Sequence, residues 1–162
     1  MDESWKGKTS LALYNLLLAL WVGGMFIYTV LVTPVLFKFF ARDTASAIVD
    51  KLFPFYFPYI LAIVGLALGF FFLSGWRKRV RPKFTFTCLV IAILISLFVN
   101  FGLYPKIRKV KQEISSFEKT TVDSPARKQF RDLHGISMIL NLVLLLDGIT
   151  LIIVSSFPKK GN

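Results

Sequence analysis

The sequence predicts an all-α integral membrane protein, a bundle of four transmembrane helices. Four stretches contain no Lys, Arg, Asp or Glu apart from one acid, and they cover about residues 11–37, 55–76, 84–104 and 135–157. Each is at least as long as the roughly 20 apolar residues that a helix needs to cross a bilayer. The composition agrees, because 55% of the 162 residues are hydrophobic and the mean hydropathy is positive. The connecting segments are short, so residues 1–162 are predicted to form one transmembrane domain.

The connector after the first span has the pattern of an amphipathic helix. Asp43 suits the N-cap position, since its carboxylate can accept a backbone hydrogen bond. Apolar residues then follow at helical spacing: Ala45, Ile48, Val49, Leu52 and Phe53. This pattern predicts a helix that lies in the membrane interface and ends at Pro54. The aromatic residues that come next suit the headgroup belt at the start of the second span.

The connector between the third and fourth spans is also predicted to be helical at both ends. Ile107, Val110, Ile114 and Phe117 keep helical spacing, so the third helix should continue beyond the bilayer. Ser124 followed by Pro125 is a helix start signal. A helix from Pro125 through residue 157 would be about 50 Å long at about 1.5 Å per residue, which exceeds the roughly 30 Å hydrocarbon core. The third and fourth helices should therefore extend together as a helical hairpin.

Small residues mark faces on which membrane helices can approach closely. Gly65 and Gly69 form a GxxxG pair in the second span, and Ala19 and Gly23 have the same spacing in the first. We expect these pairs to pack helices within one molecule. Homo-oligomer formation through the same four residues is the alternative.

The formal net charge of +11 comes from cations that flank the apolar spans. This placement favours anionic lipid headgroups as partners and argues against nucleic acid. Orientation follows from charge density, because Arg77, Lys78, Arg79, Arg81 and Lys83 crowd the short linker between the second and third spans. Such a linker is hard to translocate. We therefore expect both termini in the cytoplasm, and, for a bacterial chain, insertion in the inner membrane.

Asp147 is the acid near the middle of the fourth span. An ionised Asp at this depth costs ~2.5–3.5 kcal/mol on insertion scales, and no span supplies a Lys or Arg to pair with it. Two interpretations are open. Asp147 could relay protons or cations, or it could hydrogen-bond structurally to a neighbour such as Asn15, Asn100, Thr150 or a carbonyl group.

A second polar group is predicted on one face of the fourth helix. His134 and Asn141 are seven residues apart, with Ser137 and Met138 alongside. Asp147 lies about 120° away from this face, because six residues of an α-helix turn through about 600°. His134 stands at the membrane edge, where its ordinary role is to hydrogen-bond a carbonyl group or a loop.

Metal and catalytic sites have weak support. A Cu(I)-type site would need His134, Met25 and Met138 to converge from two helices, and the single Cys88 is expected to be core packing. The only His lies at the membrane edge, which disfavours a haem ligand. We find no paired carboxylates, Gly-rich phosphate loop or Ser-His-Asp pattern. The sequence therefore predicts no enzyme and no cofactor.

Several blocks of this sequence resemble the transmembrane-protein-205-like family, which contains a DUF4149-type domain of unknown function. The blocks are WVGGMFIYTVLVTPVLF at 21–37, KLFPFYF at 51–57, Tyr104 with Pro105, FRDLHGISMILN at 130–141, and Asp147 with Gly148. The resemblance spans nearly the whole chain and implies a single four-helix membrane domain. It also implies a link to tolerance of metal-containing drugs and to vesicle membranes, without a settled biochemical activity. This chain departs from animal members in a shorter third connector and in Asp147, where they carry an amide.

Two functional classes follow from these observations. One is a small transport, efflux or toxic-solute-tolerance component whose path is lined by Asn15, Asn100, Asn141 and Asp147. The other is a structural or trafficking scaffold in which the polar residues only hold helices together. A metal- or haem-binding membrane protein is the third alternative.

Overall fold

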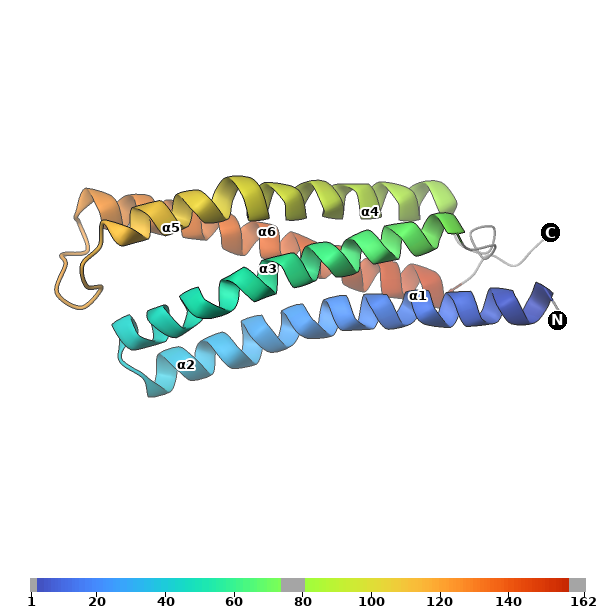
Figure 1. Ribbon diagram of the computed structural model, residues 1–162, viewed down its shortest axis with the longest axis horizontal. Coiled ribbons are helices and arrows are strands. Elements are labelled where there is room, and N and C mark those ends of the chain that lie inside the picture. The colour runs from blue at the N-terminus through green and yellow to red at the C-terminus, as the bar shows by residue number, and fades with distance from the viewer. Residues whose placement is uncertain (1–2, 74–80, 158–162) are drawn as a thin grey trace.

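The computed structural model describes residues 3–73 and 81–157, and all of its regular structure is helical. Four long helical rods run up and down in sequence order (Figure 1). The first consists of α1 (Glu3–Phe26), η1 (Ile27–Val32) and α2 (Thr33–Phe39), and the second is α3 (Arg42–Leu73). The third consists of α4 (Pro82–Leu97), η3 (Phe98–Leu103) and α5 (Tyr104–Gln112), and the fourth is α6 (Pro125–Ser156). This confirms the predicted four-helix bundle.

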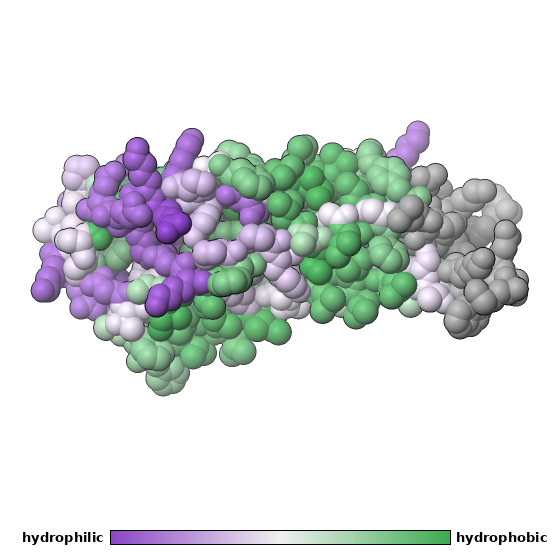
Figure 2. All heavy atoms as spheres, in the orientation of Figure 1, coloured by the Kyte–Doolittle hydropathy of each residue, from purple (hydrophilic) through white to green (hydrophobic). Residues whose placement is uncertain are grey.

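All four rods are long and apolar enough to cross a membrane. Each has about 31 or 32 residues in its candidate span, or about 47 Å at 1.5 Å per residue, so each exceeds the roughly 30 Å hydrocarbon core. At the end of the bundle formed by α2, α5 and the starts of α3 and α6, hydrophilic side chains gather over α5 and the helix starts, while the middle of the bundle is hydrophobic (Figure 2). The protein is therefore a multi-pass membrane protein, and we call the end formed by α2, α5 and the starts of α3 and α6 its polar end.

The core of the bundle lies within the apolar half. Tyr14, Leu18, Trp21 and Met25 follow one another at three- and four-residue spacing on α1 and are buried. They pack with residues of α3, α4 and α6: Ile60, Ile63, Val64, Ala67, Phe71, Leu89, Ala92, Leu144 and Leu151. In lipid this packing stabilises by close van der Waals contact, because the hydrophobic effect gives little preference for protein over hydrocarbon.

Two wide helical turns, η1 and η3, interrupt the first and third rods shortly before Pro34 and Pro105. Proline lacks an N–H and its ring collides with the carbonyl four residues earlier, so a wider turn relieves the clash. In η1 the carbonyl of Tyr28 accepts a hydrogen bond from the Thr33 N–H, five residues later, and a second from Thr33 Oγ1 at 3.0 Å. Tyr28 and Thr29 lie within η1, and Tyr104 is the first residue after η3.

The segment after Asp43 is helical as predicted, but it is not a separate interfacial helix that ends at Pro54. α3 continues through Pro54 and Pro58 to Leu73. A soluble helix would end at such a proline, whereas a membrane helix tolerates it, because stopping in lipid would leave more backbone groups without partners. The hairpin prediction is confirmed in outline, since α5 ends at Gln112 and α6 begins at Pro125 with Ser124 Oγ accepting from the Arg127 N–H.

The glycines that bring helices together are not the predicted ones. A Cβ at Gly23 or Gly69 would meet no atom within 4 Å among the described residues, and one at Gly65 would only touch Ile93. Instead, a Cβ at Gly148 would lie 2.7 Å from Val22 Cγ2, and one at Gly24 would lie 2.8 Å from the Tyr59 ring. Close helix packing through the two predicted pairs is therefore wrong, because Gly23 and Gly69 face no neighbouring atom within 4 Å and Gly65 only touches the tip of Ile93.

Candidate functional site

A cavity of about 610 Å³ lies at the polar end, between η1, α2 and α3 on one side and α5 and α6 on the other. Pockets that hold small molecules usually measure about 300–1,000 Å³. Aromatic side chains form much of its wall: Tyr28, Phe37, Phe53, Tyr56, Phe57, Tyr104, Phe117 and Phe130. The cavity also contains five cationic side chains, Arg42, Arg108, Lys111, Arg127 and Arg131, and one acidic side chain, Asp50. It is therefore positively charged and rich in aromatic groups.

The floor of the cavity is a hydrogen-bonded group centred on Asn141 of α6. The Tyr56 hydroxyl donates to Asn141 Oδ1 at 2.9 Å, and Asn141 Nδ2 donates to Thr29 Oγ1 at 3.0 Å. The Tyr28 ring stacks on that of Tyr56, with centroids 4.2 Å apart. One amide thus joins three helical rods, which fixes the depth of the cavity.

A second, much smaller void of about 10 Å³ lies next to this floor and shares Tyr56, Ser137 and Asn141 with the large cavity. Its volume is close to that needed for one water molecule. Asn100 also lines it, and the Asn100 Nδ2 group donates to the carbonyls of Ser96 and Phe57, at 2.8 and 3.2 Å. Asn100 therefore joins the third rod to α3.

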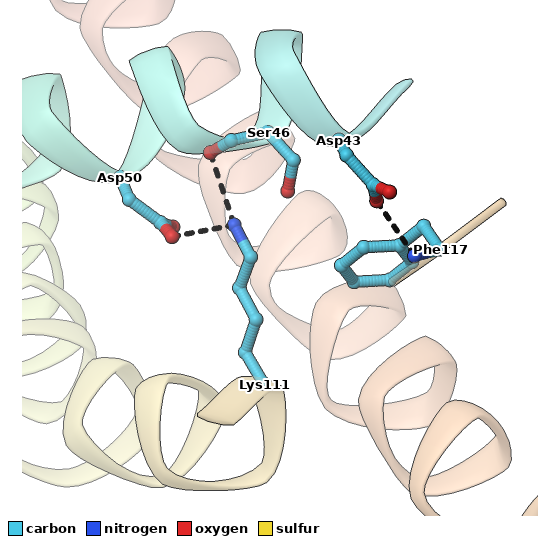
Figure 3. Close-up of polar contacts among 5 residues, drawn as sticks. All are labelled: Asp43, Ser46, Asp50, Lys111 and Phe117. Atoms are coloured by element: carbon cyan, nitrogen blue, oxygen red, sulfur yellow. Dashed lines mark hydrogen bonds and ion pairs between the residues drawn. The ribbon is translucent and has the colours of Figure 1, made fainter. Parts of the chain in front are cut away.

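An ion pair connects the two walls of the cavity. Lys111 Nζ of α5 lies 2.6 Å from Asp50 Oδ2 of α3 and donates to the carbonyl of Ser46 at 3.0 Å (Figure 3). The Lys111 side chain is mostly buried, with 15% of its surface exposed. Both partners of this ion pair belong to helices, so the positions of the two charges relative to each other are fixed. The contact holds α5 against the start of α3.

The segment between α5 and α6, residues 113–124, forms a strap over this end of the cavity. Asp43 accepts a hydrogen bond from Ser116 Oγ at 2.5 Å. It also accepts one from the Phe117 N–H at 2.6 Å (Figure 3). Arg127 donates to the carbonyls of Phe117 and Thr120, at 2.9 and 2.7 Å. Phe117 packs edge-on against Phe130 and lines the cavity. The strap is therefore attached to both α3 and α6.

These contacts also set the ionisation of Asp43, which lies outside the apolar part of α3. The hydrogen bond from Ser116 and the backbone hydrogen bond from Phe117 lower the pKa of its carboxyl below the ordinary value. Both donors favour the charged form. Asp43 is thus a carboxylate at neutral pH.

Three of the five cavity cations have no acidic partner in the part of the chain that the structure describes. Lys111 is paired with Asp50, and Arg127 is bound to the strap. Arg42, Arg108 and Arg131 line the cavity and form no salt bridge within residues 3–73 and 81–157. Their side chains are exposed. They leave the cavity with guanidinium groups available to an anion.

The predicted face of the fourth helix is confirmed, since His134, Ser137, Met138 and Asn141 all line the large cavity. Asp147 does not line it, in agreement with its rotation by about 120°. Asp147 lies instead beside Cys88 of α4 and Tyr14 of α1.

The structural partners considered for Asp147 are partly wrong. Asn100 donates to backbone carbonyls of Phe57 and Ser96, and the Thr150 hydroxyl donates to the Leu146 carbonyl of its own helix. Asn15 is half-buried on α1, and its Oδ1 has no hydrogen-bond partner among the described residues. The four polar residues of the predicted transport path are therefore divided between different places in the bundle.

The Cu(I)-type site is not formed by the residues considered for it. Met25 is fully buried in the core, where the Trp21 indole N–H donates to its sulfur at 3.0 Å. It does not line the cavity that contains His134 and Met138. Within the described part of the chain, no group of three or more His, Cys, Asp or Glu side chains could hold a metal ion.

Sequence reasoning missed the cationic wall and the strap contacts. A signal was present on α6, where the cavity residues have alternating four- and three-residue spacing: Arg127, Arg131, His134, Met138 and Asn141. Extending the predicted face by two turns toward Pro125 would have included both arginines. No sequence signal pairs Lys111 with Asp50 or Asp43 with the strap, since these contacts depend on how the rods are placed.

Comparison with known proteins identifies the family. Residues 16–116 match the family described as "Domain of unknown function (DUF4149)", and the chain belongs to it. A similar protein from Aquifex aeolicus (strain VF5), described as an uncharacterized protein, is 30% identical over 154 residues, which cover 95% of this chain and 99% of that protein. No solved structure matches the chain.

Proposed function

We propose that this member of the DUF4149 family takes small solutes into the cavity at its polar end, as a transport, efflux or toxic-solute-tolerance component. The observation that carries the proposal is the 610 Å³ cavity, whose charged and aromatic wall is assembled from all four helical rods. A bundle stabilised only by packing would gain nothing from holding such a space open, because the residues that line it lose packing contacts. No catalytic step is part of this proposal.

The proposed setting is the inner membrane of a bacterium, which the Aquifex aeolicus relative supports. With both termini in the cytoplasm, the cavity would face the opposite side of the membrane, because α2, α5 and the starts of α3 and α6 lie at the other end of the bundle from the start of α1 and the end of α6 (Figure 1). The cations at this end would contact anionic headgroups. Four helices are few for an alternating-access carrier, so transport would use a homo-oligomer. Gly23, which faces no neighbour in the bundle, is available to such an interface with Ala19.

Proteoliposomes test the proposal directly. We would compare flux of anionic, neutral and cationic amphiphilic dyes through the wild type, Met138→Trp and Ile139→Trp. Met138 lines the cavity and Ile139 does not, although both are well exposed, at 58% and 64%. We expect flux of at least one dye class through the wild type and Ile139→Trp, and its loss in Met138→Trp. No flux of any dye through the wild type would overturn the proposal.

Asp147→Asn belongs to the same experiment, as a test of whether the intramembrane acid takes part. Unchanged flux would remove Asp147 from the mechanism, and a loss of pH-dependent flux would support a proton-relay role. Its position beside Cys88 and Tyr14, outside the cavity, makes its contribution separable from that of the cavity wall.

A scaffold role is the second candidate, favoured by the hydrogen bonds of the polar residues. Asn141, Asn100 and Lys111 each join different rods. Interhelical hydrogen bonds in membranes contribute about 0.6 kcal/mol on average, so these three groups can act as structural contacts alone. The flux experiment separates this reading from the first.

A further inference from the structure

We propose that the cavity binds an anionic amphiphile, a molecule with a phosphate headgroup on a hydrocarbon chain. This inference rests on the proposed solute-binding role of the cavity and names the ligand class. Its basis is the coexistence, in one space, of an aromatic wall and three arginines that have no acidic partner among the described residues.

The cationic side of the cavity is suited to bind an anionic group. Arg108 of α5 and Arg131 of α6 approach the same space from two helices, and Arg42 adds a third guanidinium at the start of α3. Guanidinium groups bind phosphate oxygens through paired, charge-assisted hydrogen bonds. The single cavity acid, Asp50, is already paired with Lys111, so no carboxylate is left to attract a cation.

The apolar side of the cavity is suited to bind a hydrocarbon chain. Tyr28, Phe53 and Tyr104 present ring faces and edges, and Met138 adds a flexible thioether side chain. Methionine adapts to chains of varied shape, and aromatic rings supply large apolar contact area. Free phosphate would use only the guanidinium groups and leave the aromatic wall without contacts. An amphiphile uses both sides at once.

Binding can be measured by calorimetry on the full-length protein in neutral phosphatidylcholine nanodiscs, with empty nanodiscs as the blank. The probes are dodecyl phosphate, inorganic phosphate and the neutral alcohol dodecanol. We expect saturable binding of dodecyl phosphate, at least about tenfold tighter than dodecanol and than inorganic phosphate. A second series in nanodiscs that contain phosphatidylglycerol distinguishes a membrane lipid from a non-lipid amphiphile as the natural ligand. Competition between phosphatidylglycerol and dodecyl phosphate would identify a membrane lipid, and no competition would identify a non-lipid amphiphile. Either result agrees with the proposal.

Single substitutions test whether the cavity arginines bind the phosphate group. Arg108→Ala and Arg131→Ala should each weaken dodecyl phosphate binding about tenfold or more, the effect expected from losing a charge-assisted hydrogen bond. Lys109→Ala is the matched control, since Lys109 is an exposed cation of α5 that does not line the cavity. Its effect should stay below about twofold. Thermal unfolding and circular dichroism of each variant confirm that the fold is retained.

The outcomes separate this inference from the proposed function. If dodecanol binds as tightly as dodecyl phosphate and Met138→Trp blocks both, the cavity is a solute site but the phosphate assignment is overturned. An equal loss in Lys109→Ala and Arg108→Ala would also overturn it, because attraction to the general surface charge would then explain binding. If none of the three probes binds, the ligand class is overturned, whereas the proposed solute-binding role is decided separately by the dye-flux experiment.

Discussion

At the scale of residues, the polar end of this protein is organised by a few side chains that each connect two or three helical rods. Asn141 joins η1 and α3 to α6, Lys111 joins α5 to α3, and Asp43 attaches the strap. Hydrogen bonds to charged groups are roughly twice as strong as those between neutral groups. Asp43, which accepts two of them, should therefore be the main point at which the strap can be loosened.

The first prediction concerns Asp43→Asn. The amide still accepts hydrogen bonds but has no charge, so the strap should open more often and amides of residues 113–124 should exchange hydrogen faster at pH 7, as measured by mass spectrometry. The lowered pKa of Asp43 fixes the pH dependence of the wild type. Its contribution to stability is complete above the ordinary Asp value of about 3.9 and is lost as pH falls through the lower folded value.

Asp123→Asn is the control for this prediction. Asp123 belongs to the same strap, but its 3.4 Å contact with Lys128 involves a side chain that is 90% exposed, and such surface pairs contribute little. Its exchange pattern should match the wild type. Equal acceleration in both variants would show that Asp43 has no special role in holding the strap.

At the scale of elements, close approach between rods depends on which glycine faces a neighbour. Gly148 of α6 packs against Val22 and Trp21 of α1, and Gly24 of α1 accommodates the Tyr59 ring of α3. The Tyr59 hydroxyl then donates to the Leu20 carbonyl at 2.8 Å. These contacts fix α1 against α3 and α6 through the apolar half of the bundle.

The second prediction is that Gly148→Ala destabilises the bundle. The new methyl group would lie 2.7 Å from Val22 Cγ2, so α1 and α6 must move apart or Val22 must change rotamer. Overpacking of this kind costs about 1–3 kcal/mol. The measurement is reversible unfolding in mixed micelles, with Gly23→Ala as the control, because a Cβ there meets nothing within 4 Å. If both variants unfold alike, the assigned α1–α6 contact is incorrect.

At the scale of the whole molecule, the number and approximate positions of the helices could be read from the sequence. Apolar stretches of sufficient length, together with the Ser124 and Pro125 start signal, locate the rods because lipid forces every backbone group to bond within its own helix. The same requirement explains why the predicted helix end at Pro54 was wrong. If α3 stopped there, it would leave polar backbone groups in an apolar environment.

The site could be predicted only in part. Helical periodicity identified His134, Ser137, Met138 and Asn141 as one face, because this depends on the geometry of a single helix. The opposite wall could not be found in this way. The positions of Asp50, Arg42 and Arg108 relative to that face depend on the wide turns and on how the rods pack. Gly23 and Gly24 also show that contacts depend on how the rods pack. They are adjacent in the sequence, but a Cβ at Gly24 would contact Tyr59 and one at Gly23 would contact nothing within 4 Å.

The central claim is that one face of α6 lines a solute-accessible cavity while the next residue faces lipid. The most direct test is labelling of Met138→Cys and Ile139→Cys, each in a Cys88→Ser background, with a charged, membrane-impermeant maleimide added to either side of sealed vesicles. We predict labelling of Met138→Cys from one side only, and protection by dodecyl phosphate, while Ile139→Cys stays unlabelled. An unreactive Met138→Cys, or equal labelling at both positions, would contradict the account.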